Sequence, residues 1–300
     1  MSHRRRRGPS IPLLLAGLVV CAGLLIAPTL TRALRSPEGT AASPAPTAAP
    51  TPAITPTMPI QSTATPTLAP TATPKLAPTP TPAAQFDYTQ PAPQTPVVDM
   101  SYFSDALFIG DSRTEGLQLY SGIEGATFFC YKGITIFDVM QNNPKKLIKL
   151  NGTSYSIVDA LTQKSGKFSK VYISLGINEL GYYDNQGFHD KFAALIDHIR
   201  ATQPNAIIYL QNQVPVNPTL CAKNWPSYVN NDKVAVYNEI FTQLAVEKKV
   251  VLLDVATALS TPEGILAQEN TVDGVHFTKG WYKEWLSYLM CHTVDPNTLG

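Results

Sequence analysis

Residues 106–112 read ALFIGDS, and this stretch decides the fold class. Four apolar residues in a row predict a short buried strand that ends at Gly110. Ser112 then stands at the carboxyl end of that strand, and we expect a helix to begin at Arg113. Ligands of open parallel sheets bind at the carboxyl ends of the strands, so Ser112 is a candidate functional residue. An ordinary helix N-cap is the alternative role for this serine.

The rest of the C-terminal two hundred residues alternates short apolar runs with longer amphipathic segments. The apolar runs predict four further strands, at residues 127–131, 170–175, 206–211 and 250–253. Apolar side chains at three- and four-residue spacings predict helices at residues 188–202, 232–248 and 279–292. Strands that alternate with helices in this way indicate a parallel sheet covered on both sides.

Two more polar positions follow predicted strands. Asn178 lies in Gly176-Ile177-Asn178-Glu179, and Gly133 follows the strand that ends at residue 131. A glycine lets the backbone approach a ligand closely and offer its N–H. Together with the N–H of Ser112, the N–H of Gly133 and the amide of Asn178 would provide three donors for one oxyanion. Taken singly, Gly133 is also typical of a turn and Asn178 of an Asx-turn.

Asp273-Gly274-Val275-His276 comes before the last predicted helix. Three-residue spacing within one turn lets a carboxylate orient an imidazole and fix its tautomer for proton abstraction. Asp254 also ends a strand, but it has no histidine beside it. Asp111 is expected to bond to backbone near the turn. The remaining histidines fit the role of a base poorly, because they precede the apolar N-terminal segment or lie on predicted helices: His3, His189, His198 and His292.

With these motifs in this order, the sequence resembles the SGNH, or GDSL-like, hydrolase superfamily, from roughly Ser104 to Met290. The resemblance implies a three-layer α/β/α, flavodoxin-like fold with a mostly parallel sheet of about five strands. It implies a catalytic triad of Ser112, Asp273 and His276. It also implies an oxyanion hole formed by Ser112, Gly133 and Asn178.

The implied chemistry is acyl transfer through a covalent serine ester, with no metal or organic cofactor. Two positions depart from the pattern of many family members: Arg113 stands where Leu follows the serine, and Glu179 stands where Asp follows the asparagine. Neither departure removes a reacting group. We expect both residues to influence substrate binding.

The first hundred residues differ sharply in composition from the rest. Arg4 to Arg7 precede an apolar stretch from residue 11 to about 30 without a charge. About twenty helical residues span roughly 30 Å, the thickness of a bilayer core. We therefore predict a cytoplasmic tail (1–10) and an uncleaved signal anchor (11–30), with the remainder outside the cell. A cleaved signal peptide, and so a secreted protein, is the alternative; a lipoprotein signal around Cys21 fits less well.

Residues 31–97 are rich in Pro, Thr and Ala and are predicted to form a disordered linker. At ~3.1 Å per residue, about sixty residues would extend at most ~190 Å. The segment could be a tether that holds the domain away from the membrane or a passive spacer. The catalytic domain is then predicted to comprise residues 98–300.

Charge and cysteine content exclude several functions. The net charge is +1, which argues against nucleic acid as a partner because phosphate binding requires a clustered basic surface. Cys130, Cys221 and Cys291 allow at most one disulfide, and no Cys/His cluster has metal-site spacing. We expect these cysteines to be small buried apolar residues.

The fold class does not select the ester. A domain outside a membrane meets envelope or extracellular glycans, and aromatic residues in predicted loops could stack on sugar rings or pack on the domain: Tyr182, Tyr183, Trp225 and Tyr228. We therefore expect Tyr182 and Trp225 to join Arg113 and Glu179 in binding substrate, and O-acetyl groups on polysaccharide to be removed. The alternatives are a polysaccharide O-acetyltransferase, a lipase or lysophospholipase-like acylhydrolase, and a non-catalytic envelope-binding module.

Overall fold

The computed structural model describes residues 85–299 of the chain. The predicted cytoplasmic tail, the predicted signal anchor and the predicted linker up to residue 84 lie outside the described residues. Within residues 85–299, no helix combines the length and the apolar character needed to cross a membrane.

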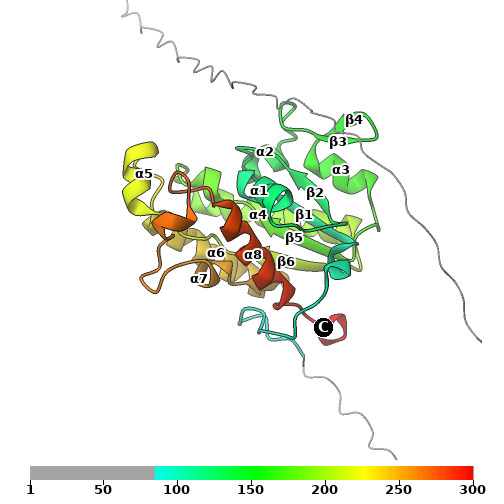
Figure 1. Ribbon diagram of the computed structural model, residues 1–300. Coiled ribbons are helices and arrows are strands. Elements are labelled where there is room, and N and C mark those ends of the chain that lie inside the picture. The colour runs from blue at the N-terminus through cyan, green and yellow to red at the C-terminus, as the bar shows by residue number, and fades with distance from the viewer. Residues whose placement is uncertain (1–84, 300) are drawn as a thin grey trace, which may run out of the picture. The chain divides into compact units, whose positions relative to one another are not determined.

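A parallel five-stranded sheet forms the centre of the domain, as predicted (Figure 1). Its order is β2-β1-β5-β6-β7, and each neighbouring pair is parallel. β2 lies on one side of β1, and the next strand of the sheet, β5, lies on the other side, as in flavodoxin-like sheets. The point at which the strand order reverses, where ligands bind in such sheets, is therefore between β1 and β5. The bounds are β1 Ala106–Gly110, β2 Thr127–Cys130, β5 Lys170–Ser174, β6 Ile207–Gln211 and β7 Val251–Leu253.

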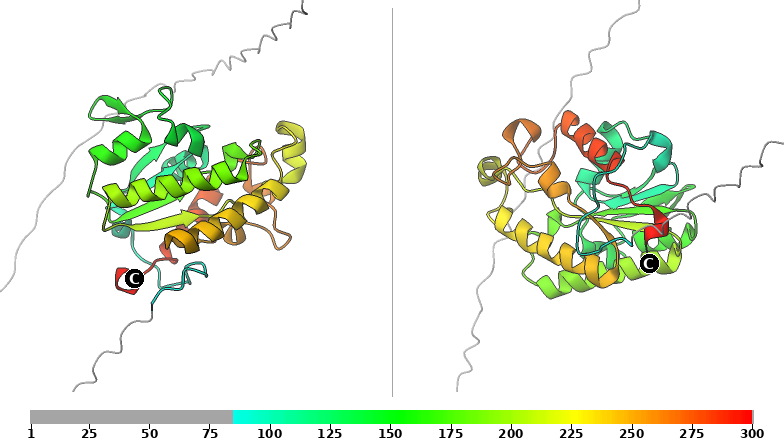
Figure 2. Two further views of the ribbon diagram at one scale, coloured as in Figure 1. Left: turned by 180° about the vertical axis from the view of Figure 1, so that it is seen from behind. Right: turned by 90° about the horizontal axis from the view of Figure 1, so that it is seen from below.

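Helices cover both faces of this sheet and complete the predicted three layers (Figure 2). Successive strand residues point to opposite faces, so Leu107 and Ile109 join one core cluster and Ala106 and Phe108 join the other. The first cluster packs against α2 Ile136–Met140, α3 Ile157–Gln163, α4 Asn185–Thr202 and α6 Asn231–Lys248. The second packs against α1 Ser112–Tyr120, α7 Val255–Ala258 and α8 Lys279–Met290.

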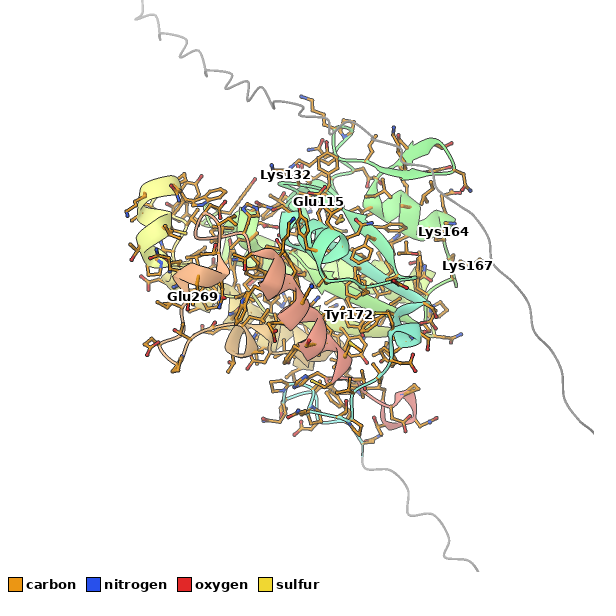
Figure 3. The ribbon with its side chains drawn as sticks, viewed as in Figure 1. Glu115, Lys132, Lys164, Lys167, Tyr172 and Glu269 are labelled. Atoms are coloured by element: carbon orange, nitrogen blue, oxygen red, sulfur yellow. The ribbon has the colours of Figure 1, made fainter. Side chains whose placement is uncertain are left out.

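Stacked aromatic rings run across the sheet face that meets α8. Tyr172 stacks between Phe108 and Tyr209, with ring centroids 4.6 and 4.5 Å apart. Its side chain is fully buried inside the domain (Figure 3). These rings supply a large apolar area beneath the strand that leads to Ser112, which anchors that strand firmly.

Residues 132–169 contain elements that the sequence pattern did not predict. Besides α2 and α3, they form an antiparallel hairpin of β3 Ile148–Leu150 and β4 Thr153–Tyr155. These elements are short, and their helices begin at side-chain caps: Thr135 and Asp138 form a capping box, and Ser156 caps α3. Elements of one or two turns show too few periods for a hydrophobic pattern to reveal them.

Shorter elements connect the layers and the ends of the chain. The helix α5 Pro218–Asn224 begins at Asn217, whose side chain caps it. The remaining short helices are of the 3-10 type: η1 Met100–Phe103, η2 Ile177–Glu179, η3 Gln268–Asn270 and η4 Pro296–Thr298.

The folded unit begins earlier than the predicted boundary at residue 98. The backbone N–H of Ala92 donates to the carbonyl of Leu252 on the edge strand β7 at 2.8 Å. Thr95 and Val98 bond in the same way to the end of α8, and Ala92 is 5% exposed within the core. Residues 85–97 therefore belong to the domain. Their composition resembles the linker because the backbone, rather than large side chains, makes most of these contacts.

The N-terminal segment should contribute to stability through Ala92. Ala92→Lys in the full chain places a charged side chain in a buried position and should reduce the free energy of unfolding by about 1–3 kcal/mol. For a domain of this size the melting temperature should then fall by several degrees. Gln94→Lys, at an exposed position two residues on, is the matched control. Equal melting temperatures for the two variants would show that residues 85–97 do not pack as described.

Candidate active site

Three of the residues singled out in the sequence follow the aligned carboxyl ends of neighbouring strands. In the sheet register, Gly110 at the end of β1 pairs with Cys130 on one side and Ser174 on the other. Ser112, Gly133 and Asn178 follow these three aligned residues within four positions. The segments that carry them therefore emerge at the same edge of the sheet, beside the switch point.

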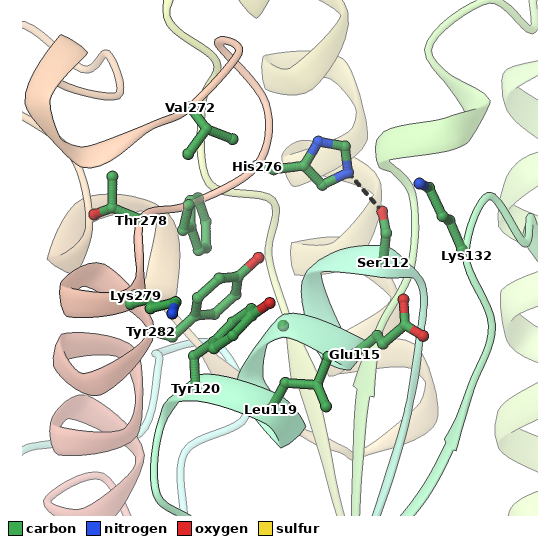
Figure 4. A pocket seen from close by; sticks show the side chains of 12 residues that line it. Ser112, Glu115, Leu119, Tyr120, Lys132, Val272, His276, Thr278, Lys279 and Tyr282 are labelled. Atoms are coloured by element: carbon green, nitrogen blue, oxygen red, sulfur yellow. Dashed lines mark hydrogen bonds between the residues drawn. The ribbon is translucent and has the colours of Figure 1, made fainter. Parts of the chain in front are cut away.

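Ser112, His276 and Asp273 form a continuous hydrogen-bonded chain. Ser112 Oγ lies 2.8 Å from His276 Nε2 (Figure 4). On the other side of the ring, His276 Nδ1 lies 2.7 Å from Asp273 Oδ2. Because an ionised carboxylate only accepts, Nδ1 carries the proton in the neutral imidazole and Nε2 is left free to accept the proton of Ser112.

The turn that carries His276 is held tightly in place. Asp273 Oδ1 accepts the backbone N–H groups of Val275 and His276 at 2.9 and 2.8 Å. Gly274 has a φ of +100°, and a Cβ there would lie 2.8 Å from Cys221 Sγ, so only glycine fits between this turn and α5. These contacts aim the imidazole at Ser112 before any substrate binds.

Hydrogen bonds also set the acidity of Asp273. Desolvation raises the pKa of this carboxyl, but the bonds from the His276 ring and from the backbone N–H groups of His276 and Val275 outweigh it and lower the pKa to about 2. Asp273 is thus ionised throughout the neutral range. Its negative charge can stabilise the imidazolium that forms when the ring takes the proton of Ser112.

Two of the three predicted oxyanion donors, Gly133 and Asn178, lie in segments that bond to each other. Asn178 Nδ2 donates to the carbonyl of Ile134 at 2.9 Å, which ties η2 to the segment after β2. Gly133 has a φ of +69°, in the left-handed region that favours glycine, and its carbonyl accepts a bond from Lys146 Nζ. The orientation of both groups is therefore fixed by neighbouring contacts.

A cavity of about 340 Å³ opens beside Ser112 and His276. Figure 4 shows its walls, which come from α1, from the start of α8 and from Lys132 after β2. The sequence interpretation did not single out Lys132, Glu115, Tyr120 or Lys279, although Glu115 and Tyr120 follow Ser112 at helical spacings of three and eight residues. That periodicity was the available indication of a cavity-facing side of α1.

The aromatic residues predicted to bind substrate lie outside this cavity. The Trp225 indole N–H donates to the carbonyl of Asp273 at 3.1 Å, and its ring centroid lies 5.9 Å from that of His276. Tyr182 stacks on Phe137, with ring centroids 4.7 Å apart. Trp225 therefore supports the turn that carries His276.

A family model described as the GDSL-like lipase/acylhydrolase family matches residues 108–283, more than half of the chain. The chain belongs to this family. It is accordingly an enzyme, a carboxylic ester hydrolase of the SGNH/GDSL type. The match covers the three strand ends and the turn that carries His276.

Solved structures also resemble this acylhydrolase. A protein from Streptococcus pneumonia named after platelet activating factor is 20% identical, with a TM-score of 0.48; the match covers 63% of this chain and 88% of that one. A GDSL-like lipase from Bacteroides thetaiotaomicron is 16% identical, with a TM-score of 0.45 and coverages of 63% and 86%. Phospholipase A1 from Streptomyces albidoflavus is 13% identical, with a TM-score of 0.40 and coverages of 61% and 97%. No curated protein matches the chain.

The structure also shows the positions of the two other aspartates and of the cysteines considered in the sequence. Asp111 is buried and caps α1 by accepting the N–H of Arg113 at 2.8 Å, as expected. Asp254 bonds to Asn212 and caps α7. In residues 85–299 the three cysteines are unpaired and no cluster of metal-binding side chains occurs. Cys221 is buried as expected, but Cys130 and Cys291 are partly exposed.

Arg113, the first departure from the family pattern, was predicted to influence substrate binding, but it does not line the cavity. Its side chain is 2% exposed. The guanidinium donates to the carbonyl of Val275 at 3.0 Å through Nε and to the carbonyl of Val214 at 2.9 Å through Nη1. It also lies 4.8 Å from the centre of the Phe277 ring. Arg113 thus ties the helix of the nucleophile to the turn that carries His276.

Glu179, the second departure, is fully buried and also does not reach the cavity. Its Oε1 accepts the backbone N–H of Ile136, and no protein group in the described chain bonds to its Oε2. Burial raises the pKa of Glu179 to about 8, against the opposing effect of the Ile136 N–H. At neutral pH this side chain is therefore mostly a neutral acid that holds η2 against the segment after Gly133.

The raised pKa of Glu179 predicts a pH-dependent effect of Glu179→Gln. Below pH 4.5 the acid is protonated in both folded and unfolded chains, so its burial adds no ionisation cost. Between pH 4.5 and about 8, Glu179 is ionised in the unfolded chain but mostly protonated in the folded chain. The free energy of unfolding of the wild type therefore falls as pH rises. Gln keeps an acceptor for Ile136 and cannot ionise. The free energy of unfolding of Glu179→Gln should rise relative to wild type, by up to about 1.4 kcal/mol per pH unit.

Urea denaturation at pH 5, 6, 7 and 8 measures this difference. Glu269→Gln, which removes an exposed carboxyl, is the matched control. A difference between wild type and Glu179→Gln that does not change across this range would contradict the burial of Glu179 as a neutral acid.

Proposed function

We propose that the domain is a serine esterase that removes O-acetyl groups from a polysaccharide of the cell envelope or the extracellular space. One observation supports this activity above the others: the hydrogen-bonded chain from Ser112 Oγ through the His276 ring to Asp273. A nucleophile, a base and an orienting carboxylate in this arrangement are the requirements for forming a covalent acyl-serine.

In the acylation step, Ser112 Oγ attacks the carbonyl carbon of the ester while its proton passes to His276 Nε2. Asp273, ionised because its pKa is about 2, stabilises the imidazolium that forms. The oxyanion accepts the N–H groups of Ser112 and Gly133 and an N–H of Asn178. Asn178 Nδ2 has two hydrogens, and its bond to the Ile134 carbonyl uses one of them, which leaves the other for the oxyanion.

When the tetrahedral intermediate collapses, His276 returns the proton to the alcohol oxygen, and the bond between that oxygen and the carbonyl carbon breaks. Water then attacks the carbonyl carbon of the acyl-serine while one of its protons passes to His276. The bond between that carbon and Ser112 Oγ breaks, His276 returns the proton to Oγ, and acetic acid leaves as acetate. Loss of one oxyanion donor should slow the reaction by about 10²–10³-fold.

Features beyond the hydrogen-bonded chain of Ser112, His276 and Asp273 favour a polysaccharide substrate. The charge-free segment 11–30 after Arg4–Arg7 is expected to anchor the chain, with the domain outside the membrane; cleavage would instead release a secreted enzyme. The linker that follows would let the domain reach glycans of the envelope. The cavity presents the exposed aromatic ring of Tyr120, a surface suited to a sugar ring.

Ser112→Ala tests the activity directly. The variant should lower kcat/KM for p-nitrophenyl acetate and for acetylated polysaccharide by about 10⁴-fold or more, because the nucleophile is lost. A fluorophosphonate probe should label the wild type and fail to label the variant. Ser287→Ala, on the exposed side of α8, is the control and should behave as wild type.

The products separate the remaining alternatives. Release of acetate supports an esterase, whereas transfer of acetyl groups to an added glycan would indicate a transferase. A preference for esters of long acyl chains would indicate a lipid substrate instead of a polysaccharide. Equal labelling of wild type and Ser112→Ala would disprove the role of Ser112, and no labelling of either would support a non-catalytic module.

A further inference from the structure

The cavity beside Ser112 carries more positive than negative charge. Lys132 and Lys279 line it, and Glu115 is the one acid among its described lining residues. Lys132 comes from the segment after β2 and reaches toward Ser112 and His276 from the side opposite the His276 turn (Figure 4). Lys279 begins α8, and its Nζ lies 5.3 Å from the centre of the Tyr120 ring.

Neither lysine forms an ion pair within residues 85–299. The lysines that do form ion pairs within residues 85–299 are Lys146, Lys170 and Lys248. Glu115 lines the same cavity but lies beyond 4.0 Å of both Lys132 Nζ and Lys279 Nζ in the described residues. The ammonium group of Lys132 lies beside Ser112, and that of Lys279 lies beside Tyr120 in the same cavity (Figure 4). A ligand anion in the cavity would form charge-assisted hydrogen bonds with such a group.

The same cavity also exposes apolar side chains. Leu119, Tyr120 and Val272 line it and are 63%, 40% and 67% exposed, although large apolar side chains are mostly buried in this domain. A simple inorganic anion would make no use of these surfaces. They suit an organic ligand with an apolar face, such as the C–H face of a sugar ring over Tyr120.

We propose that this cavity binds the alcohol part of an O-acetylated saccharide that carries an anionic group, a carboxylate or phosphate, close to the scissile ester. The inference rests on the proposed esterase function. His276 must protonate the leaving alcohol, and His276 lines the cavity, so the alcohol part belongs there. An acetyl group is too small to require a cavity of about 340 Å³, whereas a substituted sugar ring is of suitable size.

A matched pair of substrates tests the proposed charge preference. O-acetylated methyl glucoside and O-acetylated methyl glucuronide differ by a carboxylate, and acetate release from each gives a ratio of kcat/KM. The wild type should favour the glucuronide by about tenfold or more, and high salt should reduce the ratio. Lys132→Met and Lys279→Met should each lower the ratio several-fold, and the double variant should bring it close to one. Lys283→Met, one turn further along α8, is the control and should keep the wild-type ratio.

The outcomes distinguish this inference from the activity on which it rests. A wild-type ratio near one, or a ratio that the double variant leaves unchanged, would disprove the anionic substrate while turnover of both esters still supports the esterase. Failure to hydrolyse either ester, together with absence of fluorophosphonate labelling at Ser112, would disprove both.

Discussion

The hydrogen bond of 2.8 Å between Ser112 Oγ and His276 Nε2 joins residues that are 164 positions apart, and the catalytic function proposed for the domain depends on it. The parallel sheet makes this contact possible because its strands end at one edge. The aligned ends of β2, β1 and β5 bring Gly133, Ser112 and Asn178 to that edge. The last part of the chain then returns over the same edge to deliver His276. A shift of the register by one residue would point Ser112 away from the imidazole.

Two buried ionisable residues maintain this arrangement at a cost in stability. Arg113 and Glu179 directly follow Ser112 and Asn178, and each bonds to the backbone of another segment of the site. Burial opposes the charged form of each: it lowers the pKa of Arg113 and raises that of Glu179. Buried polar groups of this kind hold loops in a defined position but lower the stability of the fold. Active sites depend on such positioning. The departures from the family pattern therefore act on the position of the reacting groups rather than on the substrate.

The sequence predicted the sheet, and it singled out the three side chains that hydrogen bonds join in the structure, because both predictions use local patterns. The apolar run of residues 106–109 and the spacing of Asp273 and His276 are visible without tertiary information. The roles of Arg113 and Glu179 could not be predicted, because a charged side chain is normally exposed and only its tertiary partners reveal that it is buried. The packing of Ala92 on β7 was missed for a related reason: a proline-rich segment makes its contacts through backbone groups that composition does not show. Lys132 belongs to no motif, and its role follows only from the cavity that it lines.

The structure of the enzyme after reaction with a small phosphonate inhibitor tests the central claim most directly, since the bound phosphonyl oxygen mimics the oxyanion. We expect phosphorus bonded to Ser112 Oγ, with the phosphonyl oxygen within hydrogen-bonding distance of the N–H groups of Ser112 and Gly133 and of Asn178 Nδ2. His276 Nε2 should face the oxygen of Ser112. A phosphonyl group on another residue, or an oxygen directed away from Gly133 and Asn178, would contradict the convergence of these segments into one active site.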